Sequence, residues 1–389
     1  MNQISNVAAN FPASGIRAMF DLAAHYPGYM NLCNGEPNFE TPDNIKKSAC
    51  DAIWGGMTKY SPEPGLPAYR QAVADKYTKQ FGVEYKPTNV CAALGGVEGV
   101  MLSLMTIMNP GDEIIVPNPS YTCYPGQVEV LGGKVVRVPL YEKDGFKLQP
   151  EVLEAAITDK TKAVVLNYPN NPIGAVLTME DAEKLADVIE KHNIYVISDE
   201  VYEVIVFDGR KHLSLAQVPR IRDKVIIVNS LSKTYAMTGW RVGYVVANEE
   251  LISYMGKMQQ TIASCLPGFI MQAAADAISG PQDAVEAMVK EYAERRTILL
   301  DGLSKVPMMK TFDTEGSFCT FINIKELLEH TGWNSQTFAE NLLKEAGVLT
   351  CGGSVFGSMG EGYLRVCFAN SKEVIAEGVK RIDQYVRSL

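Results

Sequence analysis

The chain has 389 residues, of which 47% are hydrophobic and 21% charged, a composition that fits a globular protein and excludes a disordered or collagen-like chain. Its 45 acidic residues outnumber the 36 Lys and Arg, and the net charge of −9 offers no general attraction for nucleic acid or anionic lipid. Because no apolar run approaches the roughly 18 residues of a membrane span and the N-terminus lacks a signal-peptide pattern, we expect a cytoplasmic protein with no membrane or nucleic-acid partner.

Cysteine and histidine offer little for a metal site. The eight cysteines contain no CxxC pair, and the four histidines contain no HExxH pattern. We therefore expect mostly buried thiols, no metal, and a reaction that depends on other side chains.

The predicted elements begin with one short helix at 16–25, in an N-terminal segment rich in Pro and Gly. Short β-branched runs then alternate with longer amphipathic segments, which indicates a largely parallel sheet covered by helices. Apolar residues at helical spacing predict crossover helices at 97–108 and 179–192. Seven strands are predicted, at 89–94, 113–117, 134–138, 163–167, 194–199, 225–229 and 243–247.

The character of the chain changes after about Pro281. A long charged helix at 284–303 is followed by predicted strands at 318–324 and 363–368 and by a final helix from Ser371. The sequence thus predicts an α/β protein whose large domain, 45–281, holds a mostly parallel seven-stranded sheet with helices on both faces. Segments 1–44 and 282–389 form a smaller α+β domain.

A Gly-Gly turn ends the first predicted strand of the sheet. Gly95 and Gly96 precede a helix, so the bare backbone N–H groups of Gly96 and Val97 and the positive helix end are suited to a phosphate. The turn lacks the GxGxxG and GxxxxGKS spacings, which disfavours a dinucleotide or ATP site.

Two further strands end in polar groups. The segment 167–174, with Asn171, either presents amide donors or is an ordinary loop. Asp199 closes an apolar strand, where its carboxylate either caps the next segment or pairs with a cation. If a pyridinium nitrogen lay about 4 Å from this carboxylate, the attraction between the two charges would be about 4 kcal/mol at an effective dielectric constant near 20. This would raise the pKa of the pyridine nitrogen by roughly three units.

The segment 225–244 carries the most informative pattern. Lys233 lies just beyond the carboxyl end of a strand, where open α/β sheets bind ligands. Such a lysine is often only a solvated loop residue, but here Ser230 and Ser232 precede it and Arg241 follows. Hydroxyl and guanidinium donors suit a phosphate dianion, so the pattern predicts an anion site beside a lysine.

A lysine, a phosphate site and a buried aspartate are what a protein contributes to pyridoxal phosphate chemistry. From about Asn31 to its C-terminus the chain resembles the fold-type I pyridoxal-phosphate-dependent aminotransferases of class I/II, which include the aspartate and aromatic aminotransferases. The resemblance is carried by SLSKTYAMTGWRVGY, YPNNPIG, SDEVY, NLCNGEPNFETP and YLRVCFA.

This resemblance implies three catalytic residues. Lys233 would attach the cofactor pyridoxal 5'-phosphate through its amine and later move a proton as general acid and base. Asp199 would keep the cofactor's ring nitrogen protonated. Tyr202, together with Asn171, would form hydrogen bonds to the phenolic oxygen of the ring.

The remaining implied cofactor contacts surround the phosphate and the ring. Tyr121 matches a position that stacks on the ring, although core packing would also explain an aromatic residue there. Tyr60 matches a tyrosine that reaches the phosphate of a neighbouring subunit, which implies a homodimer with shared active sites. The phosphate would be held by Gly96, Val97, Ser230, Ser232 and Arg241.

Substrate binding is implied at Arg365, which would grip the α-carboxylate in a bidentate pair, and at Gly35 and Asn171. Arg365 is alternatively a surface strand residue. Dicarboxylate-specific members carry a further basic group near the Gly-Gly turn or on the partner subunit, but the turn here continues with Val97 and the segment 259–267 lacks Arg. We therefore expect neutral or aromatic L-amino acids as donors and a 2-oxo acid, such as 2-oxoglutarate, as acceptor.

Three other functions use parts of the same pattern. A pyridoxal-phosphate β-lyase or a related synthase would need the same lysine, aspartate and arginine. A ligand sensor within a regulator would need a DNA-binding appendage, which the sequence does not show. A nicotinamide-dependent dehydrogenase would need the missing glycine fingerprint.

Overall fold

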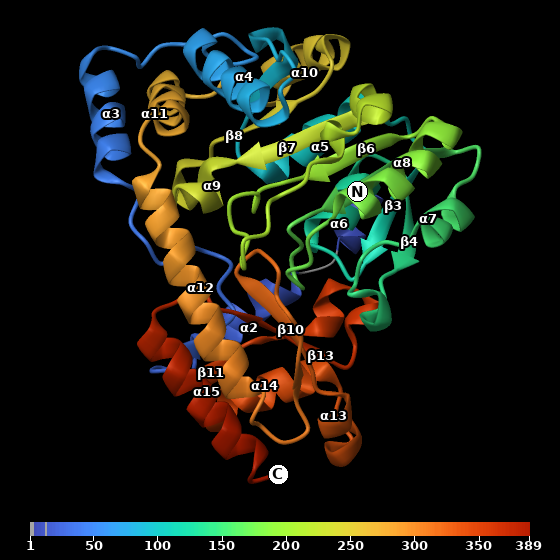
Figure 1. Ribbon diagram of the computed structural model, residues 1–389, viewed down its shortest axis with the longest axis vertical. Helices are drawn as coiled ribbons and strands as arrows, with labels where there is room; N and C mark the ends of the chain where they lie inside the picture. Colours follow the sequence, from blue (N-terminus) through green and yellow to red (C-terminus); the bar gives the residue numbers. More distant parts are fainter. Residues whose placement is uncertain (1–3, 12–13) are drawn as a thin grey trace.

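The computed structural model describes residues 4–11 and 14–389, so residues 1–3 and 12–13 of the predicted small domain lie outside the described residues. Figure 1 shows a large upper part built on one sheet and a smaller lower part, with the long helix α12 (Asp283–Leu303) running from one to the other. No helix in the described ranges has the length and apolar character needed to cross a membrane.

The large part is organised by a seven-stranded sheet in the order β2-β8-β7-β6-β5-β3-β4. Only β8 runs antiparallel to its neighbours, so the predicted mostly parallel sheet is confirmed. All seven predicted strands are present, with ends that differ by up to two residues. Their bounds are Val90–Ala93 (β2), Glu113–Asn118 (β3), Lys134–Pro139 (β4), Thr161–Asn167 (β5), Tyr195–Asp199 (β6), Val225–Ser230 (β7) and Gly243–Val246 (β8).

Successive strand residues face opposite sides of the sheet, and both sides are buried. In β7, Ile226 and Val228 belong to one apolar cluster, whereas Val225 and Ile227 belong to the other. The first cluster is covered by α5 (Gly96–Ile107), α6 (Cys123–Val130) and α10 (Glu249–Ala263). The other side is covered by α4 (Pro67–Phe81), α7 (Pro150–Ala156), α8 (Met179–His192) and α11 (Gly268–Ser279), and α3 (Asp43–Trp54) packs on α11.

The smaller part contains an antiparallel sheet in the order β12-β13-β10-β9. The N-terminal β1 (Met30–Asn31) pairs with β11 (Val348–Leu349), so the N-terminal segment packs on the C-terminal part as expected. The domain boundaries themselves stay a prediction, and residue 45 lies within α3. The other elements are α1 (Asn6–Asn10), α2 (Gly15–Ala23), β9 (Lys310–Thr311), β10 (Cys319–Asn323), α13 (Lys325–Thr331), α14 (Ser335–Ala346), β12 (Cys351–Gly352), β13 (Tyr363–Cys367) and α15 (Lys372–Val386).

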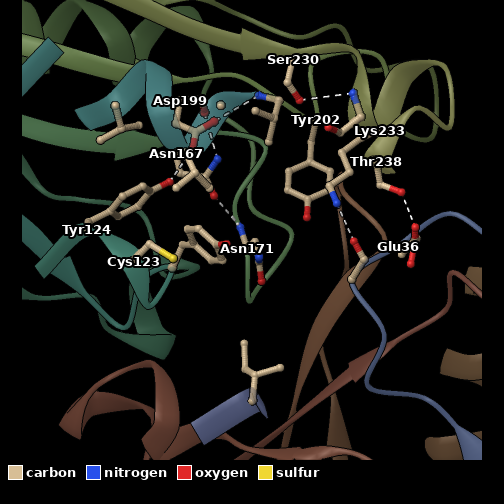
Figure 2. Close-up of a pocket in the computed structure, with 18 of the residues that line it drawn as sticks. Glu36, Cys123, Tyr124, Asn167, Asn171, Asp199, Tyr202, Ser230, Lys233 and Thr238 are labelled. Atoms are coloured by element: carbon tan, nitrogen blue, oxygen red, sulfur yellow. Dashed lines mark hydrogen bonds between the residues drawn. The ribbon is translucent and has the colours of Figure 1, made fainter. Parts of the chain in front are cut away.

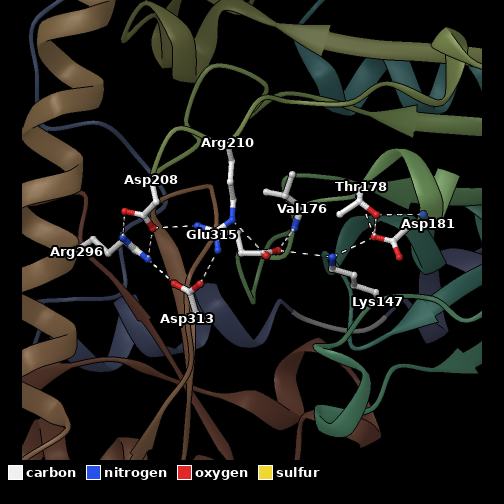
Figure 3. A network of polar contacts seen from close by, with 9 residues as sticks. All are labelled: Lys147, Val176, Thr178, Asp181, Asp208, Arg210, Arg296, Asp313 and Glu315. Carbon is white, nitrogen blue, oxygen red and sulfur yellow. Dashed lines mark hydrogen bonds and ion pairs between the residues drawn. The ribbon is translucent and has the colours of Figure 1, made fainter.

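A network of charged side chains joins the two parts (Figure 3). Arg296 on α12 and Arg210, from the loop after β6, both pair with Asp313, which lies in the loop between β9 and β10. Glu315 lies 3.5 Å from Arg210 and accepts a hydrogen bond of 2.9 Å from the backbone N–H of Val176, in the loop after β5. The network therefore fixes the start of β10 against the loops at the carboxyl edge of the large sheet.

Candidate active site

A cavity of about 530 Å³ lies at the carboxyl edge of the large sheet, where it meets the small part. Figure 2 shows that side chains from several strand ends point into it. All predicted site residues except Tyr60 line this cavity. They are Gly35, Gly96, Val97, Tyr121, Asn171, Asp199, Tyr202, Ser230, Ser232, Lys233, Arg241 and Arg365.

Lys233 projects from α9 (Leu231–Thr234), a single helical turn that begins directly after β7. Its Nζ donates a hydrogen bond of 2.6 Å to the carbonyl oxygen of Gly35, so Gly35 presents an acceptor to the lysine. Burial lowers the pKa of Lys233, because a low-dielectric site disfavours the ammonium form. This shift favours the neutral amine, which is the nucleophilic form.

Asp199, the last residue of β6, is buried and held by two donors. The Tyr124 hydroxyl donates to its Oδ2 at 2.6 Å, and the Val201 N–H lies 3.3 Å from its Oδ1. Burial raises the pKa of Asp199 to about 6, because its two donors and the charge of Lys233 offset the loss of hydration only in part. The predicted cap and the predicted cation site are therefore compatible.

The Asn171 turn is joined to Asp199 through Asn167, a residue of the 167–174 segment that was not predicted to belong to the site. The Asn167 side chain donates to the carbonyl of Asp199 at 2.9 Å and accepts from the N–H of Asn171 at 2.8 Å. Tyr124 was also not predicted, although it lies three residues after Tyr121 and its N–H donates to the Tyr121 carbonyl at 3.4 Å.

The end of the cavity that is predicted to hold the phosphate is lined by backbone and guanidinium donors. Helix α5 begins at Gly96, and no side chain caps its first turn. Arg241 donates to the carbonyls of Thr238 (2.8 Å) and Leu94 (3.1 Å), which holds its guanidinium beside Gly95. Gly95 has φ +83°, and a Cβ there would lie 2.6 Å from an Arg241 nitrogen, so glycine is required for this close approach.

Arg365 on β13 lies fully inside the protein and is not the surface residue of the alternative interpretation. Its guanidinium donates to the carbonyl of Cys33 at 2.6 Å and packs 4.8 Å from the ring centroid of Phe356. A hydrogen bond with Cys351 and the charge of Arg365 lower the pKa of the Cys33 thiol to about 6. The arginine thus sits among sulfur atoms that favour its charged form.

The three predicted tyrosines occupy different environments. Tyr121 packs edge-on against Tyr124, with ring centroids 5.5 Å apart. The Tyr202 ring packs against Phe318, and burial raises the pKa of Tyr202, so its hydroxyl stays protonated and can donate. Tyr60 lies outside the cavity and is 91% exposed, as a side chain must be if it serves a neighbouring subunit.

Several lining residues were not predicted from the sequence. Ile16 and Phe20 of α2 form an apolar wall, and Thr238 donates its hydroxyl to Glu36. Glu36 directly follows Gly35 in the segment NLCNGEPNFETP. This adjacency is the sequence feature that could have identified it. The other unassigned lining residues are Asn34, Val100, Cys123, Gln127, Val201 and Gly239.

The cavity fits pyridoxal phosphate at both ends. An uncapped helix N-terminus, two serine hydroxyls and Arg241 suit a phosphate dianion. Asp199 lies at the same edge of the sheet. Its raised pKa indicates that a protonated ring nitrogen would stabilise the ionised carboxylate. Within the described residues, the buried Asn171 Oδ1 has no hydrogen-bond partner. Lysine, anion site and acid on this sheet define the class of fold-type I pyridoxal-phosphate enzymes.

A family model described as Aminotransferase class I and II matches residues 27–382, and the chain belongs to this family. It is therefore a pyridoxal-phosphate-dependent amino-acid transaminase. It is 39% identical to an aromatic-amino-acid aminotransferase of Thermococcus litoralis, over 96% of each chain. It is also 39% identical to an aspartate aminotransferase of Pyrococcus horikoshii, over 95% of this chain and 94% of the relative.

Solved structures agree with this assignment. The aspartate aminotransferase of Rhizobium meliloti superimposes with a TM-score of 0.95 at 32% identity, over 100% of this chain and 99% of that chain. The aromatic aminotransferase of Pyrococcus horikoshii superimposes with a TM-score of 0.89 at 39% identity, over 95% and 99%. These names favour amino transfer over the β-lyase alternative.

Proposed function

We propose that the enzyme transfers the amino group of neutral or aromatic L-amino acids to a 2-oxo acid. The observation that carries this preference is the distribution of charge in the cavity. Among the described lining residues, the only basic side chains are Lys233, Arg241 and Arg365, and each of these has a role at the cofactor or the α-carboxylate. A distal substrate carboxylate would meet Ile16, Phe20 and other neutral groups, or the carboxylate of Glu36.

Each site residue acts at a defined atom in this proposal. The Arg365 guanidinium binds and orients the substrate α-carboxylate. When bound, the cofactor supplies an electron-withdrawing ring for the electrons released from the Cα–H bond. The Lys233 amine would take the proton from Cα and, as a general acid, deliver it to the C4′ carbon of the cofactor. Asp199 would keep a proton on the ring nitrogen of the cofactor, and the Tyr202 hydroxyl would donate to its phenolic oxygen.

A donor panel tests the substrate preference. With one 2-oxo acid acceptor, we expect kcat/KM for phenylalanine and methionine to exceed that for aspartate by about tenfold or more, because an unpaired buried carboxylate costs more than 1.4 kcal/mol. Stoichiometric conversion of the acceptor to an amino acid checks for transfer. An aspartate value far above the others would show the preference to be wrong.

We also propose a cytoplasmic homodimer in which Tyr60 completes the neighbouring site. Ile53, Trp54, Met57 and Tyr60 are exposed on α3 and the loop after it, and an exposed apolar patch of this kind favours a protein interface. The eight cysteines are free thiols, which is typical of a reducing compartment.

Light scattering tests this dimer, and we expect twice the chain mass of 42.7 kDa. Tyr60→Phe should weaken cofactor binding without changing that mass, because the phenyl ring keeps its packing while the hydroxyl is lost. A monomeric holoenzyme with full activity would contradict the proposal.

A further inference from the structure

The residue that follows Asp199 carries a second buried carboxylate, and this one does not line the cavity. Glu200 is fully buried. Its Oε1 accepts hydrogen bonds from the hydroxyls of Ser198 (2.8 Å) and Ser214 (2.6 Å), and its Oε2 lies 2.9 Å from Nε2 of His212. Three donors thus hold one carboxylate that lies next to the cavity in the chain but does not line it.

These contacts fix the main chain as well as the side chain. Burial of an unpaired carboxylate lowers the stability of a fold. Glu200 is therefore tolerated only in the position where all three donors reach its carboxylate. Its N–H donates to the carbonyl of Val228 at 2.8 Å, and its carbonyl accepts from the N–H of Glu203 at 2.9 Å. Because adjacent Cα atoms are about 3.8 Å apart across a rigid peptide, a displacement of Glu200 also displaces Asp199.

A second set of contacts holds the other end of the same turn. Glu203, next to Tyr202, pairs with Lys76 and accepts a hydrogen bond of 2.7 Å from the side chain of Asn229. Asn229 in turn accepts from the N–H of Ser230 at 2.7 Å. Ligand atoms of Glu200, Glu203 and His212 lie within 4.8 Å of one another, but the ammonium of Lys76 already neutralises Glu203. The arrangement is therefore an ion-pair network with no need of a metal.

We propose that Glu200, held by His212, is a positioning residue that aims Asp199 and Tyr202 at the cofactor. This inference rests on the proposed function of those two residues. Arg365, which binds the substrate carboxylate, lies on β13 and shares none of these contacts. Loss of the Glu200 contacts should therefore slow the chemical step and change the electronic state of the bound cofactor. It should leave substrate binding nearly unchanged.

The test compares Glu200→Gln with a matched buried carboxylate at the opposite edge of the sheet. Glu113 at the start of β3 is 5% exposed and binds Lys134 (2.8 Å) and Thr158 (2.7 Å). In holoenzymes, Glu200→Gln should lower kcat by about ten- to a hundredfold, the cost of misplaced catalytic groups, with KM for the amino acid within about twofold. It should also raise the pH midpoint of the cofactor's visible absorbance, because a misplaced Asp199 no longer keeps a positive charge on the ring.

Glu113→Gln should lower the thermal midpoint of unfolding but leave kcat and the absorbance titration unchanged. If Glu200→Gln proves too unstable to purify, His212→Leu gives the same readouts, and His212→Gln, which keeps a donor for Glu200, should restore them. Wild-type kcat and absorbance in Glu200→Gln or His212→Leu would overturn the inference, as would equal losses in Glu113→Gln. Amino transfer by the wild-type enzyme in the same assays tests the proposed function separately.

Discussion

Lys233→Ala is expected to abolish the visible absorbance of the bound cofactor and to reduce kcat by at least about 10⁴-fold. General acid–base catalysis alone contributes about 10²- to 10⁴-fold, and the variant also loses the amine that attaches the cofactor. The substitution removes one hydrogen bond, from Nζ to the Gly35 carbonyl, and a side chain whose charge is already disfavoured by burial. The fold should therefore persist.

Absorbance spectra and single-turnover rates of purified Lys233→Ala check this expectation, and mass spectrometry after borohydride treatment locates the attached cofactor. Tyr121→Phe is the matched control, because it keeps the aromatic ring beside Tyr124 and should reduce kcat only mildly. A Lys233→Ala enzyme with wild-type colour and rate would remove the basis for the assigned site.

Asp199→Asn should have the second largest effect. It should lower kcat of the holoenzyme but stabilise the cofactor-free protein. In the holoenzyme, loss of a carboxylate near the ring nitrogen removes about 4 kcal/mol at a separation of about 4 Å, which corresponds to roughly 10³-fold in kcat. The amide keeps an acceptor for the Tyr124 hydroxyl, so the loss reports charge and not packing. Steady-state kinetics and the absorbance titration measure it.

In the cofactor-free protein the same substitution should be stabilising. Burial raises the pKa of Asp199 from 3.8 to about 6, so the folded state holds the proton more tightly than the unfolded chain. The resulting penalty is absent below pH 3.8, grows as the pH rises towards 6 and is complete above it. At 1.36 kcal/mol per pKa unit the penalty is on the order of 3 kcal/mol. Urea unfolding should therefore show a larger gain for Asp199→Asn at pH 8 than at pH 5.

Asp181→Asn supplies a control of opposite sign. Burial acts against ionisation of Asp181, but hydrogen bonds from Thr178 and the charge of Lys147 outweigh it and lower the pKa of Asp181. Its ionised form therefore stabilises the fold above the unfolded pKa, and the amide should reduce stability at pH 8. An Asp199→Asn protein that is also less stable at pH 8 would contradict the raised pKa.

The large sheet was predictable because its strands other than the edge strand β4 are buried on both faces and read as short apolar runs between helical segments. The helical turn α9 between Ser230 and Tyr235 could not be predicted, because a single turn is too short to show helical periodicity. The helices at 249–263 and 268–279 were also not predicted. Small-part strands of two residues, such as β11 and β12, carry too few side chains for any alternation to appear.

The candidate site followed from the rule that parallel strands deliver their carboxyl ends to one edge. That rule brings together the groups on β6, β7 and the Gly-Gly turn, but it does not show which neighbours hold them. Tyr124 and Asn167 contact Asp199 and the Asn171 turn through side-chain geometry, which depends on tertiary packing. Phe20 enters from α2, 75 residues before the Gly-Gly turn at Gly95, a separation that no local sequence pattern spans.

The antiparallel β8 bears on how this enzyme folds. Ser230 pairs with Gly243 and the Leu231 N–H bonds to the Val242 carbonyl, so Lys233 and Arg241 lie on one short excursion between adjacent strands with no crossover helix. Closing so small a loop costs little entropy, whereas bringing Arg365 to the cavity closes a loop of more than a hundred residues. We therefore expect Lys233 and Arg241 to come together early in folding through local contacts. Arg365 joins the site only after the C-terminal segment that contains β13 has packed against the large part.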